Sequence, residues 1–152
     1  MASCARAAPP AARAAEACAR RARARSIGAV IGPEMLHGYD DQGSRFGASG
    51  NFENWWSDKD KTGFEERTGK LVAQFDAYES IEGLHVNGKL TLGENIADLG
   101  GLAVAYDALQ RELATKKVAE IDGYTQDQRF FMNWATVWRR NFKPEELKVR
   151  LQ

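Results

Sequence analysis

The pattern of apolar and polar residues predicts a chain made mostly of helices. In several stretches apolar side chains recur every three or four residues with charged residues between them. This spacing gathers the apolar residues on one face of a helix. We therefore expect helices over Trp56–Tyr78, Thr91–Leu113 and Gln126–Arg140, and a shorter helical piece from Pro144 to the end. The fold class indicated is mainly α, with little or no sheet.

The large apolar residues of these helices are expected to face inward. In the second helix they are Leu92, Ile96, Leu99, Leu102, Ala103, Tyr106, Leu109 and Leu113. In the third they are Phe130, Phe131, Trp134, Val137 and Trp138, and we expect Trp55 and Trp56 in the core as well. The segments Tyr39–Asn54 and Ser80–Lys89 are rich in glycine and polar residues and are predicted as loop and turn-rich connector.

The stretch from Ile27 to Asp41 has a weaker helical pattern. Its apolar residues follow helical spacing, but Gly28 and Gly32 lower helix propensity and Pro33 interrupts the pattern. A proline in a helix interior costs about 3 kcal/mol, because it removes a backbone donor and clashes with the preceding turn. At the first helical position it is harmless. The helix is therefore expected either to be interrupted at Pro33 or to begin at Gly32 and Pro33.

Composition divides the chain in two. Residues 1–25 contain twelve alanines, six arginines and one glutamate, whereas residues 26–152 carry fifteen basic and twenty acidic residues. We expect a low-complexity, disordered Ala/Arg-rich tail over residues 1–25 and a single folded domain over residues 26–152. The tail could imitate an organelle transit peptide. The favoured explanations are a low-complexity tail, or coding sequence joined to the domain by an upstream frameshift or a mispredicted start.

Several functional classes are excluded or disfavoured. Both cysteines, Cys4 and Cys18, lie in the tail, so the body of the chain has neither a disulfide framework nor a cysteine metal site. No stretch approaches the roughly 18 apolar residues of a membrane span, and no signal peptide is recognisable. The basic tail could bind nucleic acid weakly, but no specific nucleic-acid partner is expected.

Candidate chemistry begins at Glu34 and His37. A zinc-peptidase helix carries two histidines four residues apart, with a glutamate directly after the first. Here Glu34 and the second histidine, His37, stand in that pattern, while Pro33 occupies the first histidine position. In the later predicted helix, Glu94 and Asp98 are four residues apart and share one face.

Two motifs in this order carry a resemblance to a known family. The stretch VIGPEMLHGYDD ends at Asp41, and GENIADLGG follows over residues 93–101. The pair resembles the catalytic domain of the neprilysin and endothelin-converting-enzyme family of zinc metallopeptidases. The likeness continues through Gly50-Asn51, Trp55-Trp56, Val86-Asn87-Gly88 and Phe131 to Trp138, and covers Ile27 to about Val149.

The resemblance implies a role for each matching residue. It makes His37 and Glu94 zinc ligands and Glu34 the general base that activates a zinc-bound water. Asp40 and Asp98 would be carboxylates that orient the ligating histidines. Zinc is the implied cofactor, peptides are the implied substrates, and an exported or periplasmic location is implied.

The sequence also departs from the family. Pro33 cannot bind a metal, and the family's upstream Asn-Ala-x-Tyr and downstream Asp-x-His patterns are absent from this sequence. We therefore expect residues 26–152 to be part of a metallopeptidase catalytic domain, in a truncated, inactive copy of a zinc metalloendopeptidase. One alternative is a non-catalytic helical module that binds a partner protein. Another is a gene-model fragment that does not fold stably.

Overall fold

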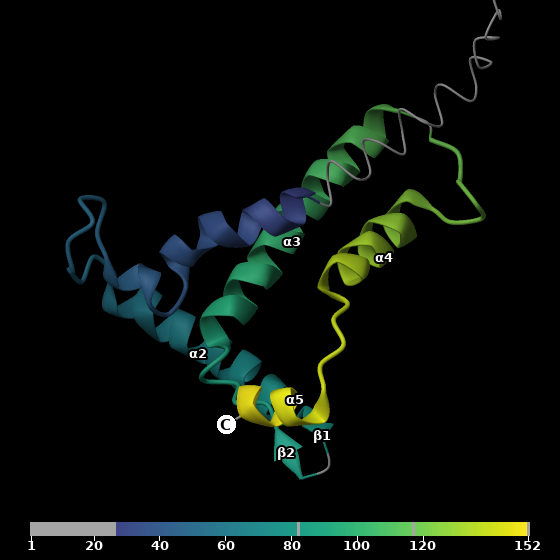
Figure 1. Cartoon of the computed structure of the whole chain (residues 1–152). Coiled ribbons are helices and arrows are strands. Elements are labelled where there is room, and N and C mark those ends of the chain that lie inside the picture. The colour runs from purple at the N-terminus through teal and green to yellow at the C-terminus, as the bar shows by residue number, and fades with distance from the viewer. Residues whose placement is uncertain (1–26, 82, 117, 152) are drawn as a thin grey trace, which may run out of the picture.

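The structure, a computed structural model, describes residues 27–81, 83–116 and 118–151, so the expected tail lies outside the described residues. A helix over residues 27–36 is followed by the helices α2 (Asp58–Asp76), α3 (Leu92–Thr115), α4 (Gln126–Trp138) and α5 (Pro144–Arg150). Figure 1 shows α3 as the long central helix, crossed by the first helix. Strands β1 (Glu79–Ile81) and β2 (Leu84–His85) form a small antiparallel hairpin. The mainly α prediction is confirmed.

Local sequence explains where the helices begin. The Ser57 hydroxyl accepts a hydrogen bond from the Asp60 backbone N–H at 3.2 Å and caps α2. Thr125 and Gln128 form a reciprocal capping box at the start of α4. Pro144 occupies the first turn of α5, where its missing donor costs nothing. No helix in the described ranges is long and apolar enough to cross a membrane.

The prediction that Pro33 interrupts or delays the first helix is wrong. The helix runs without a break over residues 27–36 and passes directly into the 3-10 turn η1 (His37–Tyr39). A proline disfavours helical geometry in the preceding residue because its Cδ meets that residue's Cβ and N–H. Gly32 has no Cβ, so the contact between the proline Cδ and a Cβ is absent, and only the contact with the Gly32 N–H remains. The helix then ends one turn after the proline.

The first helix packs on a ridge of small residues along α3. Ala97, Gly101, Ala105 and Leu109 recur every four residues on one side of α3, and all are buried. A Cβ on Gly32 would lie 2.7 Å from the Gly101 Cα, so the two backbones meet directly. Beyond this crossing Ala29, Ala105, Leu109 and Phe130 form one buried cluster. The first helix, α3 and α4 therefore share a single core.

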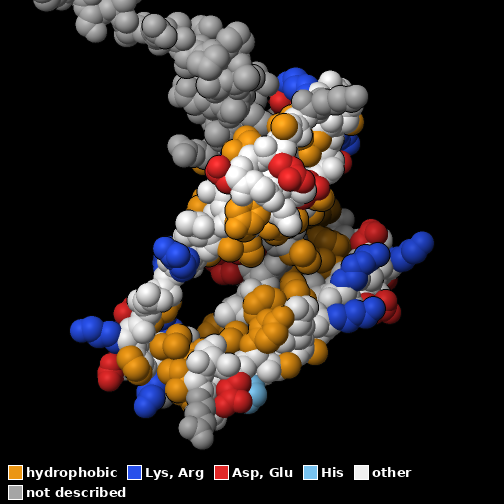
Figure 2. Space-filling model, turned by 90° about the vertical axis from the view of Figure 1, so that its right-hand side faces the viewer, with side chains coloured by type: hydrophobic (Ala, Val, Ile, Leu, Met, Phe, Trp, Pro, Cys, Tyr) orange, Lys and Arg blue, Asp and Glu red, His pale blue; other side chains and the backbone are white. Residues whose placement is uncertain are grey.

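Several large apolar residues expected in the core lie outside it. Leu99 is 62% exposed, Ala103 is exposed, and Trp55, Phe131, Val137 and Trp138 are each more than two-fifths exposed. The buried face of α3 is the narrow ridge, and α4 contributes chiefly Phe130 to the core. On the side of the molecule that Figure 2 displays, hydrophobic side chains gather above and below an opening in the surface.

Candidate functional site

The structure brings His37 and Glu94 together from distant parts of the sequence. His37 begins η1, and Glu94 lies in the first turn of α3, which contacts η1. The His37 Nε2 lies 3.6 Å from the Glu94 Oε2. This distance is too long for a strong hydrogen bond. The Glu94 side chain is 80% exposed, so its carboxylate is free to move toward a shared ligand.

Asp40 holds the other side of the His37 ring. Its Oδ2 lies 2.8 Å from the His37 Nδ1, and its Oδ1 accepts hydrogen bonds from the backbone N–H groups of Gln42 and Gly43. Asp40 is only 5% exposed. Because Nδ1 is engaged by this fixed carboxylate, Nε2 is the ring nitrogen directed toward Glu94. A carboxylate on the far nitrogen is the usual support of a metal-binding histidine.

These contacts shift the pKa values of both groups. The hydrogen bond to Asp40 raises the pKa of His37 above its ordinary value of 6.5, and the nearby carboxylates of Glu94, Asp40 and Glu34 add to this against the opposing effect of burial. Burial alone would raise the pKa of Asp40. The hydrogen bonds from His37, Gly43 and Gln42 outweigh burial and lower it.

We expect the His37 ring of metal-free protein to titrate above pH 6.5, and Asp40→Asn to lower the midpoint because it removes the largest raising influence. The stability that the raised pKa provides is fully present below pH 6.5 and is lost as the pH rises through the folded-state pKa. NMR titration of the ring in the presence of a chelator measures this. Asp41→Asn is the control, since Asp41 bonds to Gln42 and not to His37. Equal midpoints in both variants would contradict the assignment.

Glu34 and Asp98 lie near this pair without joining it. Glu34 is exposed, and its charge helps to raise the pKa of His37. Asp98 lies one turn beyond Glu94 on α3 and forms no hydrogen bond or ion pair with another described residue. Burial, assisted by the charge of Glu94, raises the pKa of Asp98. An unpaired, partly buried carboxylate at this position is consistent with the absence of the imidazole that it is expected to orient.

Pro33 stands at the position where the zinc-peptidase motif has its first histidine. It is buried, and its ring packs against α3 at Gly101. Among the described residues no group of three or more His, Cys, Asp or Glu side chains is placed to hold a metal ion. His37 and Glu94 offer one nitrogen and one oxygen, whereas a catalytic zinc ion takes three protein ligands and a water. The residues present therefore do not fit a tightly bound zinc ion.

Three important glycines were not identified from the sequence alone. Gly32 and Gly101 lie where the first helix crosses α3, and Gly93 lies beside Asp40. A Cβ on Gly93 would lie 3.0 Å from the Asp40 Oδ2 and 3.2 Å from the Asp41 Oδ1. Gly93 therefore lets both carboxylates approach the start of α3. The glycines within GENIADLGG were visible in the sequence, but only the packing explains them.

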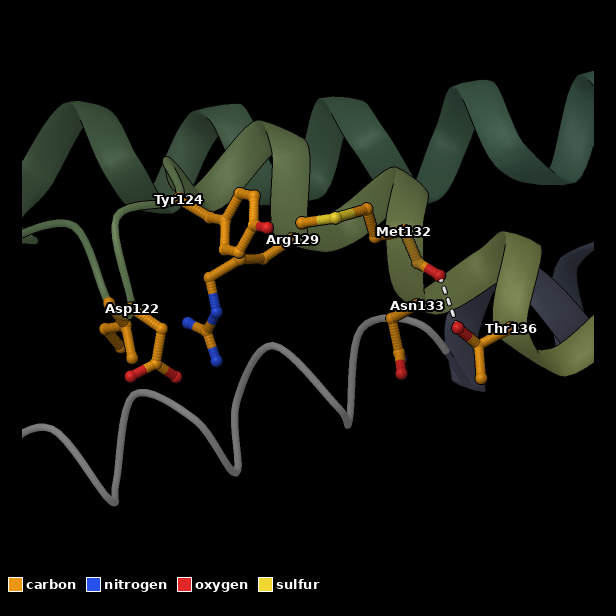
Figure 3. A pocket seen from close by; sticks show the side chains of 7 residues that line it. Asp122, Tyr124, Arg129, Met132, Asn133 and Thr136 are labelled. Atoms are coloured by element: carbon orange, nitrogen blue, oxygen red, sulfur yellow. Dashed lines mark hydrogen bonds between the residues drawn. The ribbon is translucent and has the colours of Figure 1, made fainter.

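A separate cavity lies at the start of α4. Its volume is about 270 Å³, and Figure 3 shows the side chains that line it, from Asp122 and Tyr124 to Thr136. The Arg129 guanidinium at this cavity donates to the Gln126 Oε1 at 2.9 Å. The Thr136 hydroxyl donates to the Met132 carbonyl within the helix. None of the candidate metal-site residues lines this cavity.

Comparison with known proteins gives consistent matches. Peptidase family M13 matches residues 19–152. Neprilysin-11 of Caenorhabditis elegans is 42% identical over 118 residues, and endothelin-converting enzyme 1 of Homo sapiens is 42% identical over 123 residues. These alignments cover 74% and 78% of this chain but only 14% and 16% of the relatives, so the chain spans a small part of their length.

A solved structure agrees with the sequence matches. The zinc metalloprotease Zmp1 of Mycobacterium tuberculosis, in complex with an inhibitor, superposes with a TM-score of 0.80 at 44% identity. The match covers 86% of this chain and 21% of the Zmp1 chain. A family match over most of the chain and a shared fold at this identity lead to one conclusion. The chain belongs to peptidase family M13, the family of neprilysin-like zinc metallopeptidases.

Proposed function

We propose that this chain carries helices of a zinc metalloendopeptidase catalytic domain whose zinc site lacks one ligand, so that it binds zinc weakly and does not hydrolyse peptides efficiently. The observation that carries the proposal is the pairing of His37 with Glu94, together with a buried Pro33 four residues before His37. In this proposal His37 and Glu94 are the remaining ligands, and Glu34 is the general base of the complete site. Asp40 orients His37, and Asp98 has lost its partner.

The weakness of the site follows from its ligand count. Removing a group that only supports a ligand typically lowers metal affinity 10- to 100-fold, so the loss of a ligand itself should cost more. The remaining oxygen ligand, on Glu94, is highly exposed and gains little from preorganisation. Family membership supports peptides as the substrate class.

We expect substoichiometric zinc in purified protein that is incubated with equimolar zinc and a competing chelator. We also expect no chelator-sensitive cleavage of a short fluorogenic peptide. Metal analysis after gel filtration and a fluorescence assay measure the two quantities. Stoichiometric, tightly held zinc together with chelator-sensitive hydrolysis would contradict the proposal. His37→Ala is the matched control, because it removes a remaining ligand and should abolish any residual zinc binding.

A second candidate function is a helical module that binds a partner protein without catalysis. The observation that favours it is a stripe of exposed apolar residues on the first helix, where Ile27, Ile31 and Met35 are 57%, 52% and 72% exposed. Contiguous apolar patches on soluble proteins often mark interaction sites. Self-association or partner capture at micromolar concentration that is independent of zinc and is lost in Met35→Lys would support this candidate. Binding that Met35→Lys leaves unchanged would count against it.

A further inference from the structure

A second, larger cavity lies between α2, the start of α3 and the loop that precedes α2. Its volume is about 470 Å³, within the range of roughly 300–1,000 Å³ that is usual for small-molecule sites. Helices α2 and α3 contact one another, and Figure 1 shows them meeting at one end of the molecule. None of Glu34, His37, Asp40, Glu94 and Asp98 lines this cavity. It is therefore separate from the candidate metal site.

The walls of this cavity are aromatic and fixed in place. Phe52, Trp56, Phe64 and Leu92 supply its apolar surface. The Trp56 ring packs edge-on against the Phe64 ring, with 5.1 Å between the ring centroids. The Trp56 indole N–H donates to the Ser44 carbonyl oxygen at 3.0 Å. Because this ring contact and this hydrogen bond hold the indole in place, the cavity is preorganised for a flat apolar group. Aromatic rings favour such edge and offset contacts.

The rim of the cavity carries charges of both signs that are not neutralised by one another. Lys61 and Glu65 lie one turn apart on α2, and Lys89 lies in the segment before α3. None of these three side chains forms an ion pair with another described residue. Arg45 is already engaged, since its guanidinium donates to Gln42 and lies 4.7 Å above the Phe52 ring. The rim therefore offers the ammonium groups of Lys61 and Lys89 and the carboxylate of Glu65, beside the further carboxylates of Asp41 and Glu53.

We propose that this cavity binds a free aromatic α-amino acid. Its ring would lie against the aromatic wall formed by Phe52, Trp56 and Phe64. Its carboxylate would meet Lys61 and Lys89, and its ammonium group would meet Glu65. A polyanion is disfavoured because the cavity is lined by acidic side chains, Asp41 and Glu53 included, as well as by basic ones. An uncharged aromatic compound would leave the charged groups unused. The zwitterion matches both the ring-lined walls and the mixed rim.

The test is titration of ¹⁵N-labelled protein with L-tryptophan in the presence of a chelator, following the indole N–H of Trp56. We expect a saturable shift with a dissociation constant on the order of 1 mM or tighter. Indole lacks both charges and tryptamine lacks the carboxylate. Each should therefore bind at least about two- to fivefold more weakly than tryptophan. An absent shift, or equal binding of indole and tryptophan, would overturn the proposal. The chelator makes this result independent of the zinc site and of its proposed weakness.

Variants separate the proposed contacts from a general effect on the fold. Lys61→Gln and Glu65→Gln change exposed residues and should each weaken tryptophan binding about two- to fivefold. Glu66→Gln and Lys70→Gln change charges of the same helix that do not line the cavity, and should leave binding unchanged. A peptide that begins with tryptophan has no free carboxylate on that residue and should bind as tryptamine does. Equal effects of the cavity variants and the control variants would overturn the proposal.

Discussion

Replacing Pro33 with histidine is expected to raise zinc affinity at least about 100-fold. The substitution supplies a nitrogen four residues before His37, the spacing at which two imidazoles of one helix face the same ion. The helix is already continuous through position 33, so no rearrangement of the backbone is required. The Nε2 of His37 is already directed toward Glu94, and the unpaired Asp98 is available to support the new imidazole.

Competition for zinc between the protein and a chromophoric chelator measures this gain. Pro33→Ala is the matched control, because it restores the backbone donor and removes the ring without supplying a ligand. We expect Pro33→Ala to bind zinc as weakly as the unchanged chain. Equal affinities of a folded Pro33→His and Pro33→Ala would show that position 33 does not face the His37–Glu94 pair. A gain that disappears in a Pro33→His, Glu94→Gln double variant would confirm that both helices contribute ligands.

Much of the architecture was predictable from local sequence. The long helices were predicted to within a few residues of their observed ends, because each has apolar residues at helical spacing. The pairing of His37 with Glu94 was implied by the family resemblance that two motifs some sixty residues apart carry. Periodicity alone could not have supplied that pairing, since each motif is a short pattern on a separate helix.

Two of the errors, at Leu99 and at Pro33, share one physical cause. Large apolar residues were expected to form the core, yet Leu99 is exposed while the small Gly101 and Ala105 are buried. Two helices that cross at backbone contact bury the residues that permit the close approach, and those are glycine and alanine. Hydrophobic scales rank such residues low, so their role is visible only once the neighbouring helix is in place.

The same contact explains the error at Pro33. A proline inside a helix is costly because of its missing donor and its clash with the preceding turn. The sequence analysis counted Gly32 as a further weakness, whereas its missing Cβ relieves part of the clash and lets the helix lie on α3. Two residues that each disfavour a helix in isolation are thus compatible with one when they are adjacent and packed.

Gly101→Ala is accordingly expected to destabilise the protein by about 2 kcal/mol or more, at the upper part of the range for overpacked sites. The added Cβ would collide with the Pro33 ring, would lie 2.5 Å from the Pro33 backbone nitrogen and 2.8 Å from the Gly32 carbonyl carbon. Backbone atoms cannot move aside as the end of a long side chain can. The first helix must therefore shift away from α3, which opens the cluster that contains Ala29 and Phe130.

Gly69→Ala on α2 is the matched control, because a Cβ there would meet nothing within 4 Å. Without a collision, the change only removes the entropic cost of a helical glycine and should stabilise the protein by about 0.5–1 kcal/mol. Urea unfolding followed by circular dichroism measures both changes, and the two variants should move the midpoint in opposite directions. If Gly101→Ala instead raised the midpoint as Gly69→Ala does, the first helix would not lie in backbone contact with α3. The proposal that position 33 faces the His37–Glu94 pair would then lose its structural basis.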